Sequence, residues 1–133
     1  MIEEPGAEMI LGLLRDEQFG PLVVIGFGGT NVETVKDVVH LLPPFDAATA
    51  RRRIDTLRLR PLLDEQRGRP EAAIESFCEV AALFSVVAAD YGDVLNEVDL
   101  NPVIVHARGC VAVDAFVTGH AGEFNLIDER QVG

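Results

Sequence analysis

Apolar and polar positions alternate most clearly over residues 97–115, and a period of two is typical of β-strands. The apolar residues Val98 and Leu100 are predicted to face the core. The opposite face then carries three oxygen-bearing side chains, those of Glu97, Asp99 and Asn101. A reversal at Arg108-Gly109 divides the stretch, so the pattern predicts a β-hairpin whose returning strand ends at Asp114-Ala115.

The loop of this hairpin decides whether two polar side chains share a face. With an even loop, Val105 lies opposite Cys110. Asn101 then lies opposite Asp114, with both side chains on one side of the sheet. A three-residue loop would put Ala115 there instead. The first register gathers carboxylates and an amide oxygen, which suit Mg²⁺ with bound phosphate, whereas the alternative is a solvated strand edge with ordinary acidic residues.

An earlier stretch is also strand-like and predicts a first hairpin, with strands over residues 8–14 and 22–25 and a polar turn over 15–21. Gly26-Phe27-Gly28-Gly29 follows its second strand. Glycines at such a place let backbone amides approach a phosphate, but the motif is neither a dinucleotide fingerprint nor a Walker loop. A plain tight turn is the alternative. Residues 32–39 fit a strand or a helix equally well.

Two helices are predicted after the hairpin. The first runs over residues 46–57 with Asp46 as its N-cap, and the second over 71–91 with Pro70 at its start and Gly92 at its end. Apolar residues recur in the second helix at spacings of three and four, which predicts a core-facing stripe: Ile74, Phe77, Cys78, Ala81, Phe84 and Ser85. Residues 117–133 show little periodicity and are expected to form a flexible tail.

Composition narrows the class of protein. A chain of 133 residues is one domain or part of one. The 22 acidic residues outnumber the 11 basic ones, giving a net charge of −11, which disfavours a nucleic-acid partner. No leader and no apolar run of about 20 residues is visible, which disfavours secretion and membrane insertion. Cys78 and Cys110 have no metal spacing and fit free thiols of a cytoplasmic protein, and the three histidines have no partner spacing.

Four short motifs stand in a fixed order and together cover about residues 5–116. They are Ala7-Glu8-Met9-Ile10-Leu11-Gly12; Arg15-Asp16-Glu17-Gln18-Phe19-Gly20-Pro21; Gly26-Phe27-Gly28-Gly29 with Val32-Glu33 and Lys36-Asp37; and Glu97-Val98-Asp99-Leu100-Asn101-Pro102 with Asp114-Ala115. This series resembles the ATP-grasp domain of the NDP-forming acyl-CoA synthetases, the group that includes ADP-forming acetyl-CoA synthetase and the succinyl-CoA synthetase β subunit. The resemblance implies an α+β fold over residues 1–116: the carboxy-terminal ATP-grasp lobe, with a mixed or antiparallel sheet packed against two main helices.

The resemblance also implies roles for particular residues. By position in the motifs, Asn101 and Asp114 are similar to the two Mg²⁺ ligands. Glu8 is similar to the acid that contacts the nucleotide just after the hinge between the lobes, and Gly28-Gly29 to glycines near the phosphates. Glu97 is similar to a residue that contacts the incoming phosphohistidine. The implied cofactors are Mg²⁺ and ATP or ADP.

The implied reaction has ATP phosphorylate an enzyme histidine, from which the phosphoryl group passes to a carboxylate and is displaced by CoA. The sequence contains no motif for the other ATP-grasp lobe, for the CoA-binding domains or for that histidine. These parts and the nucleotide are therefore the expected partners, and we expect no synthetase activity from the chain alone. The surface that would meet the other lobe also favours a homodimer. The alternatives are a non-catalytic regulatory or protein-interaction module derived from this lobe, and an unrelated acidic α+β domain.

Overall fold

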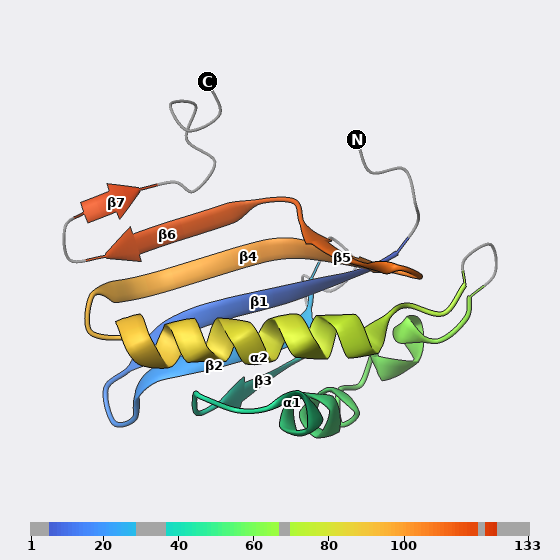
Figure 1. Ribbon diagram of the computed structural model, residues 1–133, viewed down its shortest axis with the longest axis horizontal. Coiled ribbons are helices and arrows are strands. Elements are labelled where there is room, and N and C mark those ends of the chain that lie inside the picture. The colour runs from blue at the N-terminus through green and yellow to red at the C-terminus, as the bar shows by residue number, and fades with distance from the viewer. Residues whose placement is uncertain (1–5, 29–36, 67–69, 120–121, 125–133) are drawn as a thin grey trace.

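The computed structural model describes residues 6–28, 37–66, 70–119 and 122–124. Its strands form one sheet in the order β3-β2-β1-β4-β6-β7, with β5 also paired to β4 (Figure 1). Every pair of neighbouring strands in the described residues is antiparallel. Two α-helices lie against this sheet, which confirms the predicted α+β class and its antiparallel form.

The amino-terminal hairpin consists of β1 (Ala7–Asp16) and β2 (Gly20–Phe27). Alternate residues of β1 are buried, because successive side chains of a strand point to opposite faces of the sheet. The strands are longer than expected, because Arg15 pairs with Pro21 and Asp16 with Gly20 inside the stretch predicted as a turn. Gly20 has a φ of 77°, a backbone conformation that glycine adopts without strain. β3 (Val38–Leu41) pairs with β2, and residues 29–36 lie outside the described part of the chain.

Both predicted helices are present, with shorter bounds. α1 is Ala47–Ile54, and the carboxylate of Asp46 accepts a hydrogen bond from the Thr49 amide at 2.8 Å, which confirms the predicted cap. α2 is Ile74–Tyr91, so its end is as predicted but its start is three residues late. A short 3-10 helix, η2 (Arg60–Leu63), lies between them. In the described part of the chain, no helix combines the length and the continuous apolar character that a bilayer span demands.

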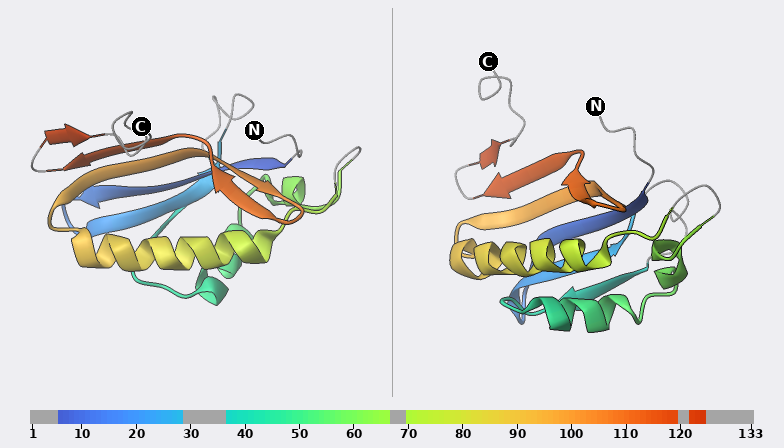
Figure 2. Two further views of the ribbon diagram at one scale, coloured as in Figure 1. Left: turned by 45° about the horizontal axis from the view of Figure 1, so that its top comes forward. Right: turned by 45° about the vertical axis from the view of Figure 1, so that its right-hand side comes forward.

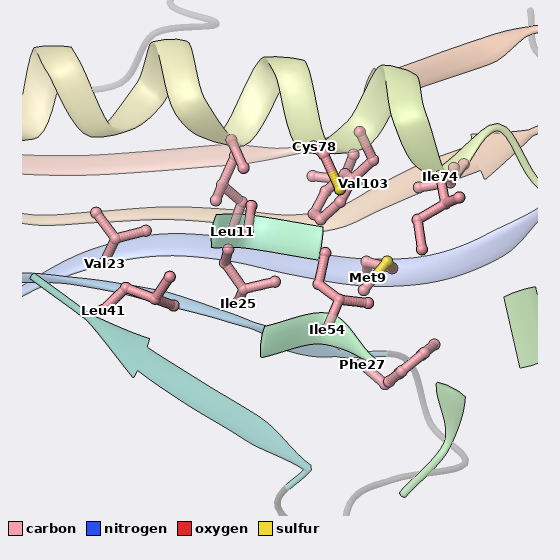
Figure 3. Packing of buried hydrophobic residues seen from close by; sticks show 14 of the residues in the cluster. Met9, Leu11, Val23, Ile25, Phe27, Leu41, Ile54, Ile74, Cys78 and Val103 are labelled. Atoms are coloured by element: carbon pink, nitrogen blue, oxygen red, sulfur yellow. The ribbon is translucent and has the colours of Figure 1, made fainter. Parts of the chain in front are cut away.

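The core lies between the helices and one side of the sheet. Figure 3 shows side chains from β1, β2, α1, α2 and β4 meeting there: Met9, Leu11, Val23, Ile25, Phe27, Ile54, Ile74, Cys78 and Val103. The predicted α2 stripe is confirmed, since Ile74, Phe77, Cys78, Ala81 and Ser85 are buried together with Ala88. Phe84, also predicted, is partly buried and packs against the core. Ser85 is a buried polar member, and its hydroxyl accepts a hydrogen bond from the Phe45 amide at 3.0 Å. Cys78 and Cys110 are both free thiols.

The predicted second hairpin is also present. β4 (Leu95–His106) turns into β5 (Gly109–Ala112), and the same return strand continues as β6 (Ala115–Gly119) alongside the first half of β4. β6 then pairs with β7 (Gly122–Phe124). The structure therefore differs from the expected boundary at residue 116, because β6 carries the sheet past it. The rest of the stretch expected as a tail lies outside the described residues.

One face of the sheet, which we call the open face, carries no helix in the described part of the chain. Figure 2 shows both helices on the same side, so that the opposite side of β2, β1 and β4 is covered by neither of them. The core-facing positions of β1 are Ala7, Met9, Leu11 and Leu13. Residues 8, 10, 12 and 14 therefore point to the open face.

Candidate functional site

The open face of the sheet has an apolar part and a polar part. A shallow hollow of about 180 Å³ lies on it, floored by Ile10, Gly12 and Val24 and bordered by the acidic residues Glu97 and Asp99. The pairing of Gly12 with Val24 on one side and with Asp99 on the other brings these groups together. The face thus combines an apolar floor with oxygen ligands along one border, as small-molecule sites generally do.

A β-bulge lies at the centre of the polar part. Met9 pairs with Val103, whereas Leu11 pairs with Leu100, so Asn101 and Pro102 both stand opposite Ile10. The extra residue reverses the alternation of β4, because Val98 is buried before it and Val103 after it. Bulges of this kind re-aim side chains and are common next to functional sites. The prediction of a simple alternating strand is wrong at this point.

The structure brings Asn101 and Asp114 together. Val105 pairs with Cys110, which confirms the even loop. The backbone amide of Asn101 donates a hydrogen bond to the backbone carbonyl oxygen of Asp114 at 3.2 Å, so the two residues are direct neighbours across the hairpin. Both residues are exposed, and the Asp114 carboxylate accepts a hydrogen bond from the Ala115 amide at 2.9 Å. The register needed for a shared site is therefore present, and the role of the pair as metal ligands stays a prediction.

Asp99 belongs to the same cluster, although no role of its own was predicted for it. It is half-buried, and burial, together with the negative charge of Asp114, raises the pKa of its carboxyl group above the usual value of 3.8. The signal in the sequence was its position on one face with Glu97 and Asn101. The coupling to Asp114 indicates that negative charge is concentrated here, and among the described residues no salt bridge involves Asp99.

The raised pKa of Asp99 predicts a pH-dependent stability. The folded protein holds this proton at pH values where the unfolded chain has released it, so the contribution of Asp99 to the free energy of unfolding is fully present below about pH 3.8 and is lost as pH rises through the folded pKa. Asp99→Asn is therefore expected to raise the free energy of unfolding at pH 7 and to lose that advantage as pH falls towards 3.8. Urea denaturation at a series of pH values measures both.

Glu79→Gln is the control for this experiment, since it removes one charge from an exposed position of α2 on the helical side of the sheet. It is expected not to reproduce the pH-dependent gain. If Asp99→Asn raised the free energy of unfolding by the same amount at every pH, the pKa of the Asp99 carboxyl group would not be raised in the folded protein.

Glu8 and Gly28 adjoin this cluster. The Gly28 amide donates a hydrogen bond to the Glu8 carbonyl oxygen at 3.0 Å, which extends the β1–β2 pairing by one step. Glu8 is exposed on the open face, and the space above Gly28 is occupied by the carboxamide of Asn101. Gly29, the other predicted glycine, lies outside the described residues. Contact of these residues with a nucleotide stays a prediction.

Glu97 lies near the start of β4. It pairs with Thr118, and Asn101 lies four residue steps away from it, which is about 13 Å along a strand that rises about 3.3 Å per residue. Its side chain is exposed at the border of the hollow. Glu97 is thus on the predicted face but at a distance from the Asn101–Asp114 pair, with Asp99 between them.

The donor set fits a metal that takes part of its coordination from a ligand. Among the residues that the structure describes, no group of three or more histidine, cysteine, aspartate and glutamate side chains is arranged to hold an ion by itself. Asn101 and Asp114 offer hard oxygen atoms, and Mg²⁺ is commonly held by one or two protein groups, with water and phosphate completing the octahedron. Burial and the nearby charge of Asp114 raise the pKa of Asp99, and two carboxyl groups placed this closely would attract a cation.

Comparison with known proteins gives a family match, two related proteins and a solved structure. Residues 1–118 match the ATP-grasp domain family. The chain is 38% identical over 114 residues to the β subunit of an ADP-forming acetate–CoA ligase of Pyrococcus furiosus, covering 84% of this chain and 48% of the relative. It is 39% identical over 114 residues to a trans-feruloyl-CoA synthase of an unknown prokaryote, covering 84% of this chain and 16% of that protein.

A solved structure shares the fold. It is an acetyl-coenzyme A synthetase of Candidatus Korarchaeum cryptofilum in complex with coenzyme A and Mg-AMPPCP, with its phosphohistidine segment pointing towards the nucleotide-binding site. The TM-score is 0.78 at 36% sequence identity, and the match covers 87% of this chain and 54% of that one. The chain thus spans about half the length of the Korarchaeum chain and of the Pyrococcus subunit.

Proposed function

Because the chain belongs to the ATP-grasp domain family, in which its relatives are ADP-forming acyl-CoA synthetases, we propose that it forms the carboxy-terminal lobe of the Mg-nucleotide site of such an enzyme. The observation that carries this proposal is the convergence of Asn101, Asp114 and Asp99 on the open sheet face beside Gly28. The enzyme of which this lobe is a part joins an acid to the thiol of coenzyme A while ATP is cleaved to ADP and phosphate.

The residues of the lobe divide this work between them. Asn101 and Asp114 hold Mg²⁺, which neutralises charge on the nucleotide phosphates during phosphoryl transfer. Asp99 adds negative charge next to this pair and strengthens its attraction for a cation. Glu8 contacts the nucleotide from the neighbouring strand, and Glu97 contacts the phosphohistidine that approaches along the border of the hollow. The apolar floor excludes water from one side of the site.

The lobe needs other parts for turnover. Phosphoryl transfer depends on positioning both reactants and neutralising charge from several sides, and an open sheet face provides one side only. The partners that complete the site are the remaining ATP-grasp lobe and the CoA-binding domains with the phosphorylated histidine. We assign this assembly to the cytoplasm, where the free thiols of Cys78 and Cys110 would stay reduced.

Binding without turnover is the expected behaviour of the 133-residue chain. Isothermal titration is expected to show ADP binding that depends on Mg²⁺ and disappears when the metal is chelated. Incubation with ATP, Mg²⁺, acetate and CoA is expected to produce no acetyl-CoA. Mg²⁺-independent ADP binding, or none at all, would contradict the proposed half-site, and turnover by the chain alone would contradict the need for other parts.

A protein-interaction role is the second candidate, and the outer face of α2 favours it. This face exposes several apolar side chains in a row: Val80, Leu83, Val86, Val87 and Tyr91. Contiguous apolar patches on a soluble domain often mark contacts between proteins. A homodimer or a regulatory complex formed through this helix would leave the open sheet face free, so the two roles are compatible in one molecule.

A further inference from the structure

Gly28 stands against the side chain of a proposed metal ligand. A Cβ atom at this position would lie 2.8 Å from Oδ1 of Asn101 and 2.6 Å from Cγ2 of Ile10. Both distances are shorter than contacts of a Cβ with non-bonded neighbours in proteins. The carboxamide of Asn101 therefore occupies the volume in which any other residue at position 28 would place its side chain.

The backbone on which Gly28 lies is held from both sides. Its amide donates to the Glu8 carbonyl oxygen of β1 at 3.0 Å, and the Phe27 amide donates to the Asp37 carbonyl oxygen at 3.1 Å. Asp37 is buried, and its carboxylate accepts hydrogen bonds from two backbone amides of the segment after α1. Phe27 is itself buried in the core. The end of β2 therefore cannot move away to make room for a side chain at position 28 without breaking these hydrogen bonds.

From this geometry we propose that Gly28 is a positioning residue: its lack of a side chain keeps the Asn101 carboxamide over the end of β2, in the orientation that lets it bind metal together with Asp114. This inference rests on the proposed function, because it concerns the same site. It assigns to Gly28 an action through Asn101, which differs from the direct approach of a backbone amide to phosphate that glycines at such places commonly provide.

Gly28→Ala tests the proposal because the added methyl group meets the ends of side chains and no backbone atom among its nearest neighbours. We expect the chain to fold, with Asn101 and Ile10 displaced. The first readout is the side-chain amide resonance of Asn101 in an ¹⁵N NMR spectrum without metal, assigned by its loss in Asn101→Ala. We expect this resonance to shift in Gly28→Ala.

Gly12→Ala is the matched control for the NMR measurement. It adds the same methyl group to the same open face, where the group would meet the Val98 carbonyl oxygen at 2.9 Å and no atom of Asn101 within 4 Å. Because this contact is with the backbone of β4, a small local shift of that strand is expected, and the Asn101 side-chain resonance should move less in this variant than in Gly28→Ala. An Asn101 resonance unmoved in Gly28→Ala, or moved equally in both variants, would overturn the proposal.

The second readout separates an action through Asn101 from direct phosphate contact. In Gly28→Ala, the Mg²⁺-dependent affinity for ADP is expected to fall by about 10-fold or more, the lower end of what loss of a group that orients a metal ligand typically costs. In an Asn101→Ala background, Gly28→Ala is expected to change the affinity by less than about twofold. If Gly28 acts through the Asn101 side chain, its effect disappears once that side chain is gone, so the two substitutions are not additive. An equal loss in both backgrounds would overturn the proposal in favour of direct contact.

The two readouts also keep this inference apart from the function on which it rests. If the unmodified chain shows no Mg²⁺-dependent ADP binding, the proposed function fails. The Asn101 resonance, recorded without metal or nucleotide, still decides whether Gly28 fixes the orientation of that side chain.

Discussion

The double variant Asn101→Ala, Asp114→Ala is expected to lose Mg²⁺-dependent ADP binding while it remains folded. The two residues are neighbours across the β4 hairpin, and both are exposed, so truncation removes oxygen ligands without opening the core. Loss of groups that only orient metal ligands costs about 10–100-fold in metal affinity, so loss of both ligands is expected to cost at least about 100-fold. Isothermal titration of ADP with and without Mg²⁺ measures the difference.

Charge and stability need separate controls in this experiment. Glu79→Ala removes one negative charge from an exposed position of α2, on the helical side of the sheet, and is expected to keep the affinity of the unmodified chain. Thermal unfolding of the double variant followed by circular dichroism shows whether the fold is kept. If the double variant is folded and binds Mg-ADP as tightly as the unmodified chain, Asn101 and Asp114 are not metal ligands but ordinary residues at a solvated strand edge.

Phe77→Ala is expected to have the largest effect on stability. Its side chain on α2 is fully buried and is the largest of the fully buried side chains in the described residues. Truncation of a buried phenylalanine costs about 3–5 kcal/mol through lost burial and the cavity left behind. Since domains of this size are stable by only about 5–15 kcal/mol, the variant is expected to be partly or largely unfolded and to lose nucleotide binding with its fold.

Leu83→Ala provides the comparison on the same helix. Leu83 is 70% exposed, so its truncation is expected to change the free energy of unfolding by no more than about 0.5 kcal/mol. Urea denaturation followed by circular dichroism gives both values. Similar costs for the two substitutions would mean that the side of α2 assigned to the core is wrong.

Local periodicity was sufficient to predict the main elements. The first half of β4 alternates and α2 carries apolar residues at helical spacing, because one face of each element is buried and the other is not. The strands of the first hairpin were instead predicted from two apolar runs on either side of a polar turn. The start of α2 was placed too early for a tertiary reason. The Ala72 amide donates to the Leu63 carbonyl oxygen and the Ala73 amide to that of His106, so this segment bonds to distant parts of the chain before the helix begins.

The end of the sheet was misjudged for a related reason. Ala115–Gly119 is too short for its alternation to stand out, and it is a strand because it pairs with the first half of β4. The bulge at Asn101-Pro102 has one signal in the sequence, a proline inside a predicted strand, but its position is defined only by the register of β4 against β1. Pairing between strands, and not local preference, decides both features.

The sequence by itself determined the alternation that puts Glu97, Asp99 and Asn101 on one side of a strand, and the order of motifs that predicts the ATP-grasp family. Only the tertiary structure decided which of these groups act on one another. It placed the Asn101 carboxamide over Gly28 and set Asp99 against the charge of Asp114. Such contacts depend on strand register and on a bulge, which are fixed when separate parts of the chain pair, and no local pattern of residues encodes them.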